Sequence, residues 1–124
     1  TSWSQVIDDD GDATLSLAGL PSGLILGRGD YVGFKWDAEG SPTGTYDRRA
    51  LVRVQLPTIA ASDGSVSALV EPAVPGAVPT GAIAHLDRPA CLMRLVPGQS
   101  QLGELDRRLK IGGGKIVATQ DLRP

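Results

Sequence analysis

The feature that most constrains the fold is a two-residue alternation of apolar and polar side chains. It recurs in four short stretches, residues 13–20, 31–36, 48–56 and 65–71. Successive side chains of a β-strand point to opposite faces, so this alternation predicts strands with one buried face. The predicted core consists of Leu15, Leu17, Val32, Phe34, Val52, Val54, Val66 and Val70. Trp36 continues the apolar face of its stretch and is also expected in the core.

Turn signals separate these stretches. The segment 19–23 (GLPSG) combines a proline with a glycine, and 61–65 (ASDGS) contains Asp-Gly, a strong hairpin signal. Residues 81–86, 91–96 and 115–120 are expected to form further strands with a less regular pattern. The chain contains 16 glycines and 9 prolines, which suits many short strands and turns. We therefore expect an all-β barrel or sandwich of about six to eight short strands.

Two connections are longer than tight turns, and one further segment has a helical rather than a strand pattern. Residues 37–47 read as a longer polar hairpin loop. Residues 71–81 contain three prolines and are expected to run extended along a sheet edge, because proline cannot donate to a strand ladder. Residues 100–110 place leucines at helical spacing after Ser100, a candidate N-cap, and before the glycines 112–114. A short helix is predicted there.

Composition excludes several classes of protein. The formal net charge is −2, which argues against a general nucleic-acid binder. No apolar run approaches the roughly 18 residues that a membrane span requires. Residues 1–12 have neither the basic nor the apolar region of a signal peptide. Cys91 is the only cysteine, so an intrachain disulfide is excluded.

One acidic and one glycine-rich segment resemble ligand-binding loops, but neither has the required spacing. Asp8, Asp9, Asp10 and Asp12 surround Gly11, but the spacing of an EF-hand calcium loop fails, since Leu17 stands where that loop needs a glutamate. A solvated acidic turn is expected instead. The segment 111–116 (IGGGKI) lacks the spacing and the Ser/Thr of a phosphate-binding loop, so a glycine-rich joint is expected.

Reactive residues are few. His85 is the only histidine, and Cys91 lies in an apolar run where a buried, inert thiol is the usual outcome. Trp36 and Tyr46 are candidates for a small sugar-stacking platform, although Trp36 belongs to the apolar face and is expected in the core. We predict no catalytic, cofactor-binding or metal-binding residue and no enzymatic activity.

The tripeptide Arg28-Gly29-Asp30 has the sequence of an adhesion signal. It also lies where the chain must reverse between two strands, and Gly27 and Gly29 supply the backbone freedom for a corner. An aspartate there closes a local turn with its carboxylate. A structural corner is therefore predicted rather than a receptor signal.

The order of these pieces resembles a known family. A GLP-x-G turn, the Gly29-Asp30 corner, an RALVRV strand (49–54), an ASDGSV segment (61–66), VEPAVP (70–75) and TGAIAHLDRPACLMRLVPG (80–98) occur in this order. This order is similar to a β-domain of tail proteins in tailed bacteriophages and prophages. The resemblance covers residues 14–98, and the loop 37–47 is longer than the short hairpin of the family pattern.

The resemblance implies a virion structural protein of the tail tube, tip or baseplate region, made in the bacterial cytoplasm and acting by assembly. It implies no catalytic residues, no cofactor, and as partners copies of the chain in a ring and other virion proteins. The alternative is a small carbohydrate- or receptor-binding module of a phage tip or bacterial surface. A third class, a hydrolase, requires a polar pocket that the sequence does not indicate.

The charge is unevenly placed along the chain; it either averages out over the folded surface or orients a subunit against its copies. Residues 1–47 carry a net charge of −6 and residues 48–124 a net charge of +4. We expect a β-domain over 1–98 and a C-terminal arm over 99–124, with apolar leucines that need a partner. The arm is expected to meet the acidic face of a neighbouring copy. The alternative is that it packs on its own domain as a final helix or strand.

Overall fold

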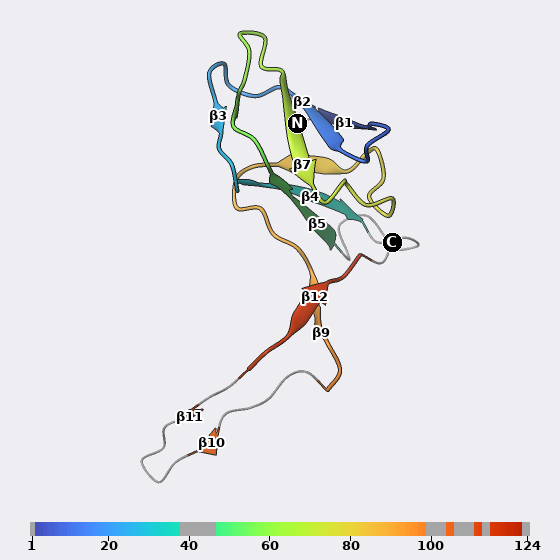
Figure 1. The fold of residues 1–124 in the computed structure, drawn as a ribbon, viewed down its shortest axis with the longest axis vertical. Helices are drawn as coiled ribbons and strands as arrows, with labels where there is room; N and C mark the ends of the chain where they lie inside the picture. Colours follow the sequence, from blue (N-terminus) through green and yellow to red (C-terminus); the bar gives the residue numbers. More distant parts are fainter. Residues whose placement is uncertain (1, 38–46, 99–103, 106–110, 113–114, 123–124) are drawn as a thin grey trace.

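A computed structural model describes residues 2–37, 47–98, 104–105, 111–112 and 115–122, and the described chain contains strands and no helix (Figure 1). The prediction of an all-β protein is thus confirmed. The strands are β1 (Ser2–Ile7), β2 (Ala13–Ala18), β3 (Ile25–Leu26), β4 (Tyr31–Asp37), β5 (Asp47–Val54), β6 (Thr58–Ile59), β7 (Val66–Glu71), β8 (Ile83–His85), β9 (Met93–Leu95), β10 (Glu104–Leu105), β11 (Ile111–Gly112) and β12 (Ala118–Gln120).

The body of the molecule is a six-stranded antiparallel sheet in the order β1-β2-β7-β5-β4-β8. Its four central strands are the four alternating stretches of the sequence. The eight predicted core residues are all at most 5% exposed, and Trp36 is 8% exposed. The alternation therefore predicted both the central strands and the face that each one buries.

The two outer strands of this sheet come together. β1 contacts β8, and the indole Nε1 of Trp3 donates a 2.9 Å hydrogen bond to the carbonyl oxygen of Ala82. The Trp3 ring also meets the Phe34 ring edge-on, with centroids 4.9 Å apart. The sheet thus curls around its core like a small barrel. The strand β1 was missed in the sequence, because its apolar residues do not alternate cleanly.

The proline-rich connection follows β1. Gln5 makes two side-chain hydrogen bonds to the backbone of Val74, accepting from its N–H at 2.8 Å and donating to its C=O at 3.0 Å. The predicted position along a sheet edge is therefore confirmed, since β1 is an edge strand. The predicted extended course is wrong in part, because turns close from Pro75 to Val78 and from Pro79 to Ala82.

The two predicted tight turns pack against each other. Leu20 donates its N–H to the carbonyl of Gly64, and Gly23 donates to the carbonyl of Ala60. Gly64 has a φ of +81°, and a Cβ at this position would collide with the carbonyl oxygen of Leu20. The glycine of the Asp-Gly pair is thus required by both its conformation and its neighbour.

A β-hairpin projects from the body (Figure 1). β9 pairs with β12, and β10 pairs with β11 further along the hairpin. The expected strands within 81–86, 91–96 and 115–120 are thereby confirmed as the shorter β8, β9 and β12. The helix expected over 100–110 is wrong at Glu104–Leu105, which form β10, and its other residues lie outside the described part. We call β9–β12 the hairpin arm.

The expected boundary at 98 falls between β9 and its partner β12. Ala118–Gln120 and Asp121 return to the body, so this part of the predicted arm packs on its own domain. The long hairpin loop expected at 37–47 begins and ends at the paired residues Asp37 and Asp47. Its residues 38–46, including Tyr46, lie outside the described part.

Candidate interaction surfaces

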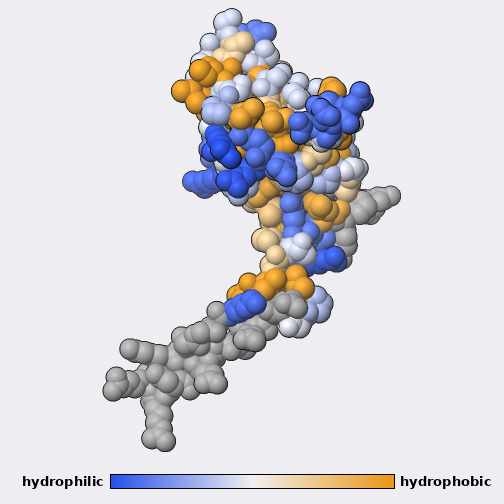
Figure 2. Space-filling view, in the orientation of Figure 1, coloured by the Kyte–Doolittle hydropathy of each residue, from blue (hydrophilic) through white to orange (hydrophobic). Residues whose placement is uncertain are grey.

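The hairpin arm carries apolar side chains that the body does not cover. Met93 is 59% exposed, Leu95 is 60% exposed and Ile116 is 75% exposed. Figure 2 shows the hydrophobic colour gathered on the hairpin where it leaves the body. A two-stranded ribbon has no second layer against which to bury such residues. The arm therefore presents an apolar surface suited to contact with another molecule.

The base of the arm is fixed to the body at β5. β7 pairs with β5 at Arg53 and Val54, so in the described part of the chain β7 does not cover the earlier residues of that edge of β5. The side-chain Oε1 of Gln120 accepts a 2.8 Å hydrogen bond from the N–H of Leu51 on this edge. Asp121 is 7% exposed and its carboxylate lies 3.8 Å from the guanidinium of Arg48.

The acidic turn, residues 8–12, joins β1 to β2. One oxygen of the Asp8 carboxylate accepts hydrogen bonds from the N–H groups of Asp10 (3.0 Å) and Asp12 (2.8 Å), and Gly11 has a φ of +87°. The predicted solvated turn is therefore confirmed. Val6 and Ile7 precede it and are 68% and 53% exposed.

A third exposed surface lies where β3 pairs with β6. Ile25 is directly opposite Ile59, and the two are 65% and 64% exposed. Ile25 and Tyr31 also line a shallow hollow of about 380 Å³ together with Leu86 and Pro89. We call Ile25, Tyr31 and Ile59 the isoleucine patch.

The Arg28-Gly29-Asp30 corner is a turn, as predicted. The Asp30 carboxylate accepts a 2.8 Å hydrogen bond from the N–H of Gly27, and Gly29 has a φ of +93°. Backbone hydrogen bonds of 2.8 Å join Gly29 and Asp30 to Val54 of β5. The corner thus fixes the entry of the chain into β4, which is a sufficient structural reason for its glycine and aspartate.

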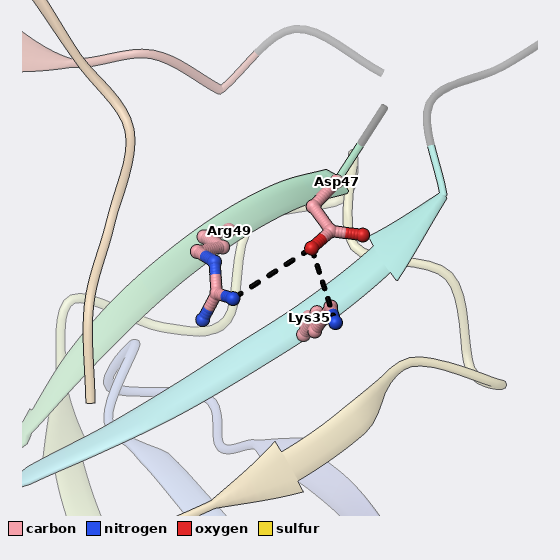
Figure 3. Close-up of polar contacts among 3 residues, drawn as sticks. All are labelled: Lys35, Asp47 and Arg49. Atoms are coloured by element: carbon pink, nitrogen blue, oxygen red, sulfur yellow. Dashed lines mark ion pairs between the residues drawn. The ribbon is translucent and has the colours of Figure 1, made fainter. Parts of the chain in front are cut away.

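Charged groups cluster where β4 ends and β5 begins (Figure 3). One oxygen of the Asp47 carboxylate lies 3.0 Å from the Lys35 ammonium and 3.7 Å from the Arg49 guanidinium. Trp36 lines an open hollow beside these groups, of about 510 Å³. Because Trp36 is 8% exposed, its indole does not offer a face for stacking on a sugar. Trp36 therefore cannot take part in the sugar-stacking platform that the sequence suggested.

The remaining reactive residues are separate structural features. The imidazole of His85 lies over Gly33 on the neighbouring strand β4, and its buried Nε2 has no hydrogen-bond partner among the described residues. Cys91 is half-buried, so the predicted full burial of its thiol is wrong. Within the described residues, no three His, Cys, Asp or Glu side chains gather as metal ligands would.

Sequence reasoning missed the exposed part of these surfaces. The apolar character of residues 91–96 predicts a strand, but it does not reveal that Met93 and Leu95 are exposed to solvent. The one sign in the sequence is that residues 91–96 do not alternate clearly. A strand with one buried face has a regular polar face, and this segment lacks one. The short β3 and β6 carry too few residues for any periodicity.

No protein-family model, curated protein or solved structure matches the chain. In the part of the chain that the structure describes, no helix has the length and apolar character needed to cross a membrane. The geometry of the surfaces is therefore the basis for the functional argument.

Proposed function

We propose that the chain is a structural component of a phage or prophage virion, in the tail, which works by assembly with copies of itself and with other virion proteins. The observation that carries this proposal is the hairpin arm with its exposed Met93, Leu95 and Ile116. The order of sequence motifs over 14–98, which resembles tail-protein β-domains, supports it independently. The proposed location is the virion tail, after synthesis in the bacterial cytoplasm.

The physical argument concerns exposed apolar area. Full burial of a Val, Leu, Ile or Met side chain contributes about 1.5–3 kcal/mol relative to its exposed state. Three such side chains on one slender projection offer several kcal/mol to a partner and nothing to an isolated monomer. Head-to-tail contacts between two different surfaces of identical subunits form a ring when the rotation closes. The proposed mechanism is therefore association through the arm, in a homo-oligomeric ring, without catalysis.

The alternative, a carbohydrate-binding module, has less support from the described residues. Sugar recognition by stacking needs an exposed aromatic ring, and Trp36 is buried. The hollow beside it is rimmed by Lys35 and Asp47, whose charges are already paired with each other. No specific observation among the described residues favours a glycan over a protein partner.

The test is the location of the chain in particles. Antibodies raised against the purified chain are applied to virions released from the source strain after prophage induction, and gold labelling is examined by electron microscopy. We expect label on the tail, and mass spectrometry of the same particles should contain peptides of the chain. A strain with the gene deleted is the control. Purified virions free of the chain would contradict the proposal.

A further inference from the structure

We propose that the hairpin arm of one copy docks on the acidic turn and the adjoining end of β1 of a second copy, a contact that rests on the assembly proposed above. The proposal identifies two surfaces that are otherwise without a described partner. It also fixes the type of contact as head-to-tail, because the two surfaces differ from each other.

Charge complementarity selects this pair of surfaces. Residues 93–120 contain five basic and two acidic side chains, and of these Arg94 and Lys115 are described and exposed. The acidic turn contains four aspartates, and the first basic residue of the chain is Arg28. Opposite charges across an interface steer encounter and fix orientation. The arm thus meets a surface of opposite sign at the turn.

Both surfaces also combine charge with apolar groups. Met93 and Leu95 flank Arg94 on the arm, and Val6 and Ile7 precede the aspartates on the body. Side chains alternate along a strand, so Met93 and Leu95 share one face of the arm. Val6 and Ile7 lie on opposite faces of β1 and leave the end of this strand apolar on both sides. Each surface therefore offers an apolar centre with charges beside it, as in stable protein interfaces.

The two surfaces are far apart within one chain. Figure 1 shows the hairpin arm extending away from the body, whereas β1 and β2 lie at the other end of the molecule's long axis. An arm anchored at Asp121 and Gln120 to β5 does not reach the acidic turn of its own body. The contact is therefore intermolecular.

The isoleucine patch is the competing acceptor. It is equally exposed, but its charged neighbours are less favourable to a basic arm. Arg53 lies directly opposite Tyr31, and Arg28 is exposed at the adjacent corner. Asp30 is the nearby carboxylate, and it closes the turn with Gly27. Electrostatics thus favour the acidic turn over this patch.

Matched serine substitutions distinguish the two acceptors. Ile7→Ser and Ile59→Ser each remove an isoleucine that is more than half exposed. Sedimentation equilibrium of the full chain at low salt should show association weakened about tenfold by Ile7→Ser, because an apolar contact is lost, and little changed by Ile59→Ser. Thermal melts check that both variants stay folded. An equal or larger effect of Ile59→Ser would overturn the proposal.

Charge reversal gives a second, independent test. Asp9→Lys and Arg94→Glu should each weaken association, and the double variant should recover a substantial part of it, because the pair of charges is restored in the opposite sense. Asp87→Lys, which changes the charge equally at an exposed site outside the turn, is the control. Failure of the double variant to recover association, or a monomeric wild-type chain at all concentrations and low salt, overturns the proposed contact.

This outcome is separable from the proposed function. One outcome is that labelling finds the chain in virion tails while Ile7→Ser and Asp9→Lys have no effect on association. In that case the tail role stands and the proposed contact fails. Association through the acidic turn with no chain in virions gives the opposite result, in which the contact stands and the tail role fails.

Discussion

The guanidinium of Arg48 lies 3.8 Å from the carboxylate of Asp121, and this ion pair joins strand β5 to the end of the hairpin arm. The side chains are 14% and 7% exposed, so both charges are largely removed from water. The side-chain oxygen of Gln120, the residue before Asp121, accepts a hydrogen bond from the N–H of Leu51 on β5. The arm thus leaves the body from a fixed base, which allows its exposed residues to be presented in a defined direction.

We expect Asp121→Ala to destabilise the protein by about 3 kcal/mol, because it leaves the Arg48 charge largely buried without this carboxylate. Urea denaturation measures the cost, and hydrogen exchange at the Leu51 amide should accelerate as the base of the arm loosens. Asp47→Ala is the matched control: its ion pairs with Lys35 and Arg49 are partly exposed, and its loss should cost less than about 1 kcal/mol. Equal costs for the two variants would contradict the fixed base.

Substitutions at two glycines distinguish the stability cost of an unfavourable backbone conformation from the cost of a steric collision. Gly23 and Gly64 have φ values of +78° and +81°, but a Cβ at Gly23 meets nothing within 4 Å, whereas one at Gly64 meets the carbonyl of Leu20. Gly23→Ala should cost about 1–2 kcal/mol from conformation alone. Gly64→Ala should cost about 1–3 kcal/mol more, from the collision. Thermal unfolding of both variants checks this order, and a smaller cost at Gly64 would be inconsistent with the packed turns.

Gly33 and His85 are coupled across β4 and β8. A Cβ at Gly33 would lie 2.6 Å from the His85 Nε2, so Gly33→Ala must displace the imidazole. We expect Gly33→Ala to destabilise the wild-type protein by about 1–3 kcal/mol and to be nearly neutral when His85 is already alanine. A double-mutant cycle by chemical denaturation measures this coupling. Additive costs would show that the ring does not lie over Gly33 in solution.

The turn at Asp63 should have a specific acid response. The hydroxyl of Ser65 donates a 2.6 Å hydrogen bond to the Asp63 carboxylate and its N–H donates another of 3.0 Å, which lowers the pKa of Asp63 below 3.8. Since the folded-state pKa is lowered, the stabilisation is present above pH 3.8 and is lost as pH falls through the lowered value.

The measurement compares wild-type protein with Asp63→Asn, which removes the titrating charge. The stability advantage of wild type should shrink as the solution is acidified through the folded-state pKa of Asp63, and an NMR titration should place that pKa below 3.8. A stability difference that stays constant down through this range would exclude a titrating carboxylate as its source.

Much of the body follows from local sequence rules. The alternation around Leu15, Phe34 and Val54 predicted the strands and their buried faces, because one face of each strand is covered by the same core. The Asp-Gly pair at 63–64 predicted a turn through the backbone freedom of glycine. Both the alternation and the Asp-Gly turn signal depend on a few neighbouring residues, and the tertiary contacts stabilise the same local structures.

The remaining features depend on contacts that no short segment encodes. β1 is held by pairing with β2 and by the Trp3 contacts to Phe34 and Ala82, which come from distant parts of the chain. β10 occupies a segment with helical leucine spacing, because the pairing of Glu104 and Leu105 with β11 prevails over local propensity. Exposure of Met93 depends on the arm leaving the body, which only the tertiary fold determines.

A chain with a shortened arm offers the most direct test of the central claim that the arm joins copies of the protein. Val96 donates its N–H to the carbonyl of Val117, so replacement of residues 97–116 by Asn-Gly closes the ribbon with a two-residue turn and keeps Gln120 and Asp121 on β5. The shortened chain also carries Met93→Ser and Leu95→Ser, because these two exposed residues lie in the part of the arm that is kept. Light scattering at high protein concentration and low salt measures the mass of both chains. We predict a multiple of 12.9 kDa for the full-length protein and a folded monomer for the shortened chain. A full-length mass of 12.9 kDa under these conditions, or undiminished association of the shortened chain, would contradict the claim.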